Sequence, residues 1–194
     1  MTTTVKERTR IVDGAALPAT GIYDFDPGHT TVAFEGRHLV ITRVRGRFLE
    51  FSGALHVAER PEASFAELAI RADSLVSGLK DRDDHLRSPD FLDTPRYPMI
   101  TFRSTSIVHV TGDHWRATGD LSIRGVTRPI DVVIEFDGAV LDPWGNEKIG
   151  FSVHGDFNRE DFGLTWNMLM EGGGLVASKR IQVDIDVEAT RRSG

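Results

Sequence analysis

Residues 181–189 have the sequence IQVDIDVEA, in which apolar and polar side chains alternate at every position. Successive side chains of a β-strand point to opposite faces, so this stretch predicts a strand with one dry face and one wet face. Residues 117–123, 130–136 and 149–157 alternate in nearly the same way. Such one-sided strands are typical of antiparallel sheets, because the strands of a parallel sheet are buried on both faces.

Less regular strands are predicted near residues 23–26, 31–38, 43–57, 65–73 and 100–107, for a total of about eight or nine. An all-antiparallel set must bury its dry faces, either in a sandwich or in a closed barrel. About eight long strands in one chain favour the barrel, because closure removes exposed edges. A barrel of this size is either filled by side chains or holds one small ligand, and alternation alone does not distinguish the two.

One segment departs from the strand pattern. Residues 77–89, SGLKDRDDHLRSP, predict a short helix between strands, with Ser77 as its N-cap and Pro89 as its end. Arg82 and Leu86 fall on the same face of this helix. The fold class is therefore all-β, an antiparallel barrel of about eight strands with one short helix, which is a candidate lid for the interior.

Length and composition set the domain organisation. The chain has 194 residues, a net charge of −6 and no cysteine. These values predict a single domain over residues 21–190 and exclude a disulfide scaffold, a thiolate zinc site and a cysteine nucleophile. The acidic balance disfavours a nucleic-acid partner. We expect residues 1–20 to form a loosely held arm and residues 191–194 a solvated tail. No stretch has the apolar length of a signal peptide or a membrane span, so we expect a soluble cytoplasmic protein.

Several short motifs follow one another in a specific order. They are DPGHT at 26–30, VRGRF at 44–48, RDDHLRSPDF at 82–91, YPMITF at 97–102, GDLSIRGVT at 119–127 and NREDFGL at 158–164. With these motifs the chain resembles the YceI-like family from about residue 23 to residue 189. The resemblance implies a lipocalin-like barrel that binds a polyisoprenoid, an isoprenoid quinone or a similar long-chain lipid without catalysis. Many relatives carry a signal peptide, and this sequence departs from them in that respect. Dimerisation is common among relatives, which brings a homodimer into consideration.

The dry faces of the predicted strands supply the candidates for a cavity lining. These side chains are apolar, many are phenylalanines, and alternation points them inward. They are Phe34, Leu49, Phe51, Leu55, Phe102, Leu121, Ile134, Phe136, Phe151, Val153, Phe157, Val183 and Ile185.

Polar candidates for the barrel mouth come from three other segments. Arg43, Arg45 and Arg47 alternate, so they share one face of a strand. One interpretation is a cationic rim that meets a phosphate or carboxylate head group, with His38 and His85 nearby. The other is that the arginines lie on the solvated outer face of the sheet.

An alternative function is a hydrolytic or isomerising enzyme with His85 and Asp83 as acid and base. The predicted dry faces hold almost no titratable groups, which favours a non-enzymatic carrier. The histidines show none of the HxH, HxxxH or HExxH spacings of metal sites, so we expect no metal. We expect no cofactor apart from a bound polyisoprenoid or quinone-type lipid.

Overall fold

The computed structural model describes residues 8–12, 14–39, 41–168 and 176–193. Its strands are β1 (Thr9–Val12), β2 (Ala15–Pro18), β3 (Gly21–Phe25), β4 (Thr31–His38), β5 (Thr42–Phe48), β6 (Phe51–Val57), β7 (Phe65–Arg71), β8 (Leu75–Val76), β9 (Met99–Thr111), β10 (His114–Ile123), β11 (Val126–Leu141), β12 (Glu147–Asn158) and β13 (Arg180–Arg191). The helices are α1 (Lys80–Arg87) and the short 3-10 turns η1 (Pro61–Ala63), η2 (Ala72–Ser74) and η3 (Arg159–Phe162).

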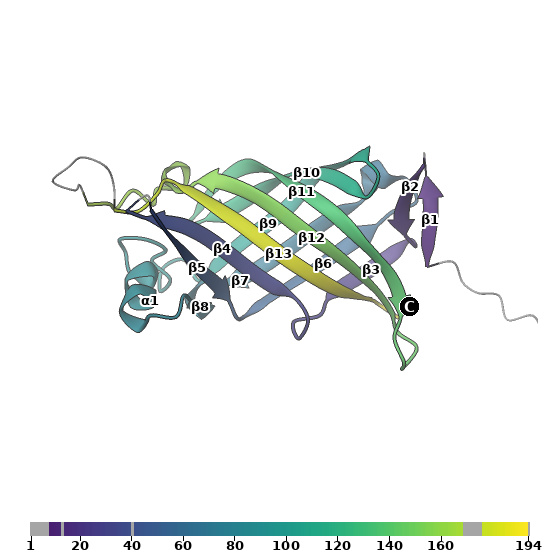
Figure 1. Ribbon diagram of the computed structural model, residues 1–194, viewed down its shortest axis with the longest axis horizontal. Helices are drawn as coiled ribbons and strands as arrows, with labels where there is room; N and C mark the ends of the chain where they lie inside the picture. The colour runs from purple at the N-terminus through teal and green to yellow at the C-terminus, as the bar shows by residue number, and fades with distance from the viewer. Residues whose placement is uncertain (1–7, 13, 40, 169–175, 194) are drawn as a thin grey trace, which may run out of the picture.

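Eight strands close into an antiparallel barrel in the order β12–β11–β10–β9–β7–β6–β3–β13, and pairing of β12 with β13 completes the circle (Figure 1). Strand β13 pairs with β3 over residues 189–191 and with β4 over residues 182–186. Strands β4, β5 and β8 therefore extend the wall at one end of the barrel. This arrangement confirms the predicted all-β antiparallel barrel with one short helix.

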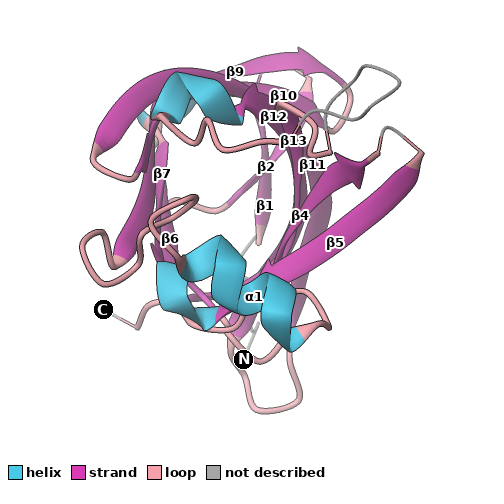
Figure 2. Cartoon of the chain, turned by 90° about the vertical axis from the view of Figure 1, so that its left-hand side faces the viewer, coloured by secondary structure: helices cyan, strands magenta, loops and turns pink. Residues whose placement is uncertain are grey.

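The two ends of the barrel differ. Helix α1 and the β4–β5 hairpin lie at one end, which we call the mouth, and Figure 2 looks into it. The β1–β2 hairpin lies at the opposite end, which we call the floor (Figure 1). No helix among the described residues is long and apolar enough to cross a bilayer.

The floor hairpin differs from the loosely held arm expected for residues 1–20. Strands β1 and β2 pair from Thr9↔Pro18 to Val12↔Ala15. Ala15 and Leu17 are only 1% and 8% exposed, and they pack into an apolar cluster with Trp115. The short run of apolar residues 15–17 therefore belongs to the barrel core, while residues 1–7 of the expected arm lie outside the described residues.

We expected a solvated tail from residue 191 onward, but Arg191 still belongs to β13. Arg191 is the last residue of β13, and its Nη1 lies 2.9 Å from Glu147 Oε2. Arg192 donates from Nε to Asp24 Oδ2 at 2.9 Å. These ion pairs tie the end of the chain to β12 and β3.

Helix α1 begins later than predicted, and Ser77 is not its N-cap. The N-cap residue is Leu79, which makes no side-chain capping bond. Ser77 instead donates its backbone N–H to Asp83 Oδ1 at 2.8 Å, and its hydroxyl also bonds to that oxygen. The buried Asp83 carboxylate thus fixes the loop before α1 against the helix and holds the helix at the mouth.

Candidate functional site: an apolar cavity with a cationic mouth

A cavity of about 690 Å³ occupies the half of the barrel nearest the mouth. Ligand pockets for small molecules generally fall between about 300 and 1,000 Å³. Residues of β4, β5, β7, β8, β9, β10, β11, β12 and β13 form its wall, and α1 lies at one side of its opening (Figure 2). Its wall is apolar almost throughout, and the charged residues that line it come from α1, η3 and the end of β4.

A second chamber of about 120 Å³ continues toward the floor. It is lined by apolar side chains, including Leu17 of the floor hairpin, Trp115 and Phe136. The two chambers share part of their walls. The shared residues are Leu68, Phe102, Val132, Val153 and Ile185. The barrel interior is therefore a deep apolar space that narrows toward the floor.

Glycines in the wall explain why the phenylalanines do not fill this space. A Cβ atom at Gly46 would lie 2.3 Å from Phe34 Cζ, and one at Gly119 would lie 2.4 Å from Phe102 Cζ. Both rings therefore lie directly over a glycine, against the wall. A side chain larger than hydrogen at either glycine would push the ring toward the barrel axis.

Most of the side chains predicted to line a cavity do lie in its wall. Leu55, Ile134, Phe136 and Phe151 line the small chamber; Phe34, Leu121, Phe157 and Val183 line the large one; Phe102, Val153 and Ile185 line both. Leu49 is 53% exposed, so its inward placement was wrong. Phe51 packs against the core cluster near the mouth but lines neither chamber. Both residues lie at the turn from β5 to β6, where simple alternation breaks down.

The predicted arginine rim is wrong. Arg43, Arg45 and Arg47 are exposed on the outer face of β5 and do not line the cavity. Arg43 Nε lies 3.3 Å from Glu35 Oε1, and Arg45 Nε lies 2.9 Å from Glu35 Oε2. The solvated outer-face interpretation is the right one, because the alternating residues between them, Val44 and Gly46, face inward.

Both histidines predicted for the mouth line the large cavity there. His85 Nε2 lies 2.9 Å from Asp90 Oδ2, and its ring meets Trp166 edge-on with centroids 4.5 Å apart. His38, at the end of β4, is bridged to Ala177 through the backbone. Asp83 is turned away into its bonds with Ser77 and does not line the cavity. The structure therefore does not bring His85 and Asp83 together as an acid–base pair facing the interior.

The cations that do line the mouth are ones for which the sequence showed no periodic signal. They are Arg37 on β4, Arg82 on α1 and Arg159 on η3, with Asp81 as the acidic residue among the described lining. Arg82 and Arg159 belong to the motifs RDDHLRSPDF and NREDFGL, which carried the family resemblance. Those motifs were the available signal, but nothing in them shows that the two segments line the same barrel opening.

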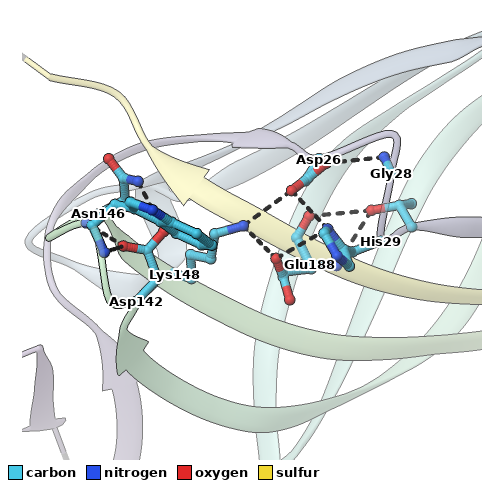
Figure 3. A network of polar contacts seen from close by, with 9 residues as sticks. Asp26, Gly28, His29, Asp142, Asn146, Lys148 and Glu188 are labelled. Carbon is cyan, nitrogen blue, oxygen red and sulfur yellow. Dashed lines mark hydrogen bonds and ion pairs between the residues drawn. The ribbon is translucent and has the colours of Figure 1, made fainter.

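A polar network outside the barrel ties together β12, β13 and the loop after β3 (Figure 3). Asp26, His29 and Glu188 approach one another closely enough to suggest a metal site. However, Lys148 Nζ lies 3.0 Å from Asp26 Oδ2 and also bonds to Glu188. The lysine ammonium thus bridges these two carboxylates and offsets part of their charge, so the network acts as a structural clamp. Hydrogen bonds from His29, Lys148 and the Gly28 backbone lower the pKa of Asp26 to about 2.

This clamp predicts an acid-dependent loss of stability. The folded pKa of Asp26 lies below the ordinary value near 3.9, so its stabilisation is present above that value and is lost as the pH falls toward 2. Urea unfolding at pH 5 and pH 2.5 should show wild type losing about 1–2 kcal/mol more than Asp26→Asn, after allowance for partial exposure. Equal losses in the two proteins would contradict this role for Asp26.

Comparison with known proteins agrees with this geometry. The chain matches the YceI-like domain family over residues 23–189. It is 34% identical to Protein YceI of Escherichia coli O157:H7 over 180 residues, which cover 92% of this chain and 91% of the relative. It is 33% identical to a UPF0312 protein of Azotobacter vinelandii over the same length, covering 92% of this chain and 91% of the relative.

Solved structures share the fold. BcnA of Burkholderia cenocepacia superposes with a TM-score of 0.75 at 20% identity, covering 86% of this chain and 99% of its own. The Campylobacter jejuni YceI protein gives 0.69 at 29% identity, covering 81% and 90%. A polyisoprenoid-binding domain from Saccharophagus degradans, implicated in plant cell wall breakdown, gives 0.62 at 18% identity, covering 88% and 98%. The family match spans nearly all of the closed barrel and the relatives align along nearly the full chain, so the chain belongs to the YceI-like family.

Proposed function

We propose that this protein binds a long-chain amphiphilic lipid of the polyisoprenoid type inside its barrel, without chemically changing it. The observation that carries the proposal is the cavity of about 690 Å³ with apolar walls, which places its charged groups at one end. An amphiphile fits such a space with its chain toward the floor and its head group at the mouth. The fold shared with the polyisoprenoid-binding domain from Saccharophagus degradans supports the same ligand class.

The expected energetics favour recognition of the chain. Each buried methylene contributes about 0.8 kcal/mol, so one isoprene unit contributes roughly 3–4 kcal/mol before the cost of ordering the chain. A neutral hydrogen bond contributes about 1 kcal/mol net. Several buried isoprene units would therefore dominate the affinity, and the small chamber beyond Phe102 gives the end of a longer chain a place to lie.

We propose binding rather than catalysis because of where the titratable groups of the wall lie. A general acid or base must reach the reacting atom of the substrate. His85 is paired with Asp90, and Asp83 with Ser77, so neither is presented to the interior as a catalytic pair. The other charged side chains of the described wall, Arg37, Asp81, Arg82 and Arg159, lie at the mouth, and the deeper wall is apolar, which suits a stored or carried ligand.

Native mass spectrometry of the purified protein tests the proposal. We expect a co-purifying species in the mass range of a prenyl lipid, and we expect the delipidated protein to take up farnesol and the longer geranylgeraniol, with tighter binding of the longer chain. A protein that carries no lipid as purified and takes up neither alcohol would contradict the proposal.

A further inference from the structure

The wall of the large cavity has a charge opposite to that of the whole protein. The chain has a net charge of −6, yet the charged side chains that line the cavity are three arginines and one aspartate among the described residues. An excess of charge of one sign in a low-dielectric cleft concentrates its field there and attracts a ligand of the other sign. Two of these arginines, Arg159 and Arg82, form no ion pair with a carboxylate of the described chain.

Arg159 is a buried guanidinium whose bonds go to backbone carbonyl groups. It is 3% exposed and donates from Nε to Ser178 O at 2.8 Å, from Nη1 to Leu164 O and from Nη2 to Ala177 O at 3.5 Å. No carboxylate of the described chain forms an ion pair with it, and burial lowers its pKa. A guanidinium has five N–H donors, so these three bonds leave donor capacity on a cavity-lining group.

Arg82 has even more unused capacity. Among the described residues its guanidinium bonds only to Ser77, from Nε to the hydroxyl at 2.7 Å and from Nη2 to the carbonyl at 2.6 Å. The adjacent carboxylate of Asp83 reaches it only through the Ser77 hydroxyl, and in the described chain no carboxylate oxygen lies within ion-pair distance of Arg82. By contrast, Arg43 and Arg45 on the outer face share Glu35.

Cations in an apolar cavity without a carboxylate partner are costly, and an oxyanion removes that cost through short, charge-assisted hydrogen bonds. We propose that the cavity mouth is an oxyanion site in which Arg82 and Arg159 bind the carboxylate or phosphate head group of the lipid. This inference rests on the proposed lipid-binding function and adds a head-group class to it. The hydrocarbon chain of the lipid and its oxyanion are then recognised at opposite ends of the same cavity.

Four ligands separate the contributions of the head group and of the chain. Farnesyl phosphate and farnesoic acid carry an oxyanion, farnesol carries the same chain without one, and inorganic phosphate carries the oxyanion without a chain. In titration calorimetry near physiological salt, we expect both anionic lipids to bind at least about tenfold more tightly than farnesol, which is the effect of one charge-assisted hydrogen bond. We expect the advantage to shrink as salt is raised. Inorganic phosphate at the same concentrations should not compete.

Arg82→Gln is the informative variant, and Arg43→Gln is its matched control on the outer face. We expect Arg82→Gln to lower the affinity for both anionic lipids at least about tenfold, while the affinity for farnesol changes less than about threefold. We expect Arg43→Gln to change neither affinity. Thermal unfolding of each variant reports whether α1 keeps its place. The salt dependence of wild type tests the site even if Arg82→Gln unfolds.

The outcomes separate the two proposals. If farnesol binds wild type as tightly as farnesyl phosphate, the oxyanion site is wrong while lipid binding stands. If Arg82→Gln lowers the affinities for farnesol and for the anionic lipids equally, Arg82 supports the mouth structurally and does not bind the head group. If no farnesyl compound binds, the proposed function itself fails. If inorganic phosphate competes, the site takes free anions and not a lipid head group.

Discussion

Replacing Val183 with tryptophan is expected to weaken farnesol binding by at least about a hundredfold. Val183 lines the large cavity from β13, where it is paired with Phe34 on β4 and with Gly155 on β12. Because Val183 lines a cavity of about 690 Å³, an indole at position 183 extends into volume that the ligand needs. Displacing about one isoprene unit removes roughly 3–4 kcal/mol of apolar burial, and 2.7 kcal/mol already corresponds to about a hundredfold.

Gln182→Trp is the matched control for this prediction. Gln182 is the neighbouring residue on β13 and is exposed on the outer face of the barrel, so its replacement adds the same ring outside the cavity. Fluorescence titration with farnesol should give the wild-type affinity for Gln182→Trp. For Val183→Trp it should give an affinity at least about a hundredfold lower. Circular dichroism melts of both variants check that the barrel is intact. Wild-type affinity in a folded Val183→Trp protein would show that the ligand lies elsewhere.

Alternation of residues predicted the barrel and much of its lining because both depend on local sequence. Strands such as β12 and β13 have one dry face along their whole length, and side-chain direction in a strand follows directly from position. The same argument placed Phe34, Phe102 and Val183 correctly. It misplaced Leu49, because that residue lies beyond the end of β5, where the strand period no longer applies.

Two properties of the site depend on contacts between distant segments, so alternation could not reveal them. Whether the barrel is hollow depends on cross-strand glycines: Phe34 lies against Gly46, and Phe102 against Gly119. Each pair is obvious only when the strand register is known. The position of the mouth cations depends on α1 and η3 both lying at the open end of the same cavity. Arg82 and Arg159 are far apart in the sequence, and neither belongs to a periodic strand.

The floor hairpin was missed because its packing also depends on contacts between distant segments. Leu17→Asp is expected to lower the free energy of unfolding by about 3 kcal/mol or more. The substitution loses about 1.5–3 kcal/mol of leucine burial. It also places a carboxylate in the small chamber, beside Trp115 and Ala117, where the described lining offers no cation. The protein must therefore either protonate the carboxyl group at some cost or release the hairpin from the barrel.

Ile11→Asp on the paired strand is the control, because Ile11 is 69% exposed and its side chain is not part of the floor. Urea unfolding should place Ile11→Asp within about 0.5 kcal/mol of wild type. Hydrogen exchange should show the amides of residues 9–18 losing protection in Leu17→Asp alone, because release of the hairpin frees the pairing of β1 and β2. If the two variants are equally stable, residues 9–18 behave as the loosely held arm that composition suggested, and the chamber is closed by other residues. If Leu17→Asp is selectively destabilised, the N-terminal segment is the floor that keeps water out of the deep end of the cavity.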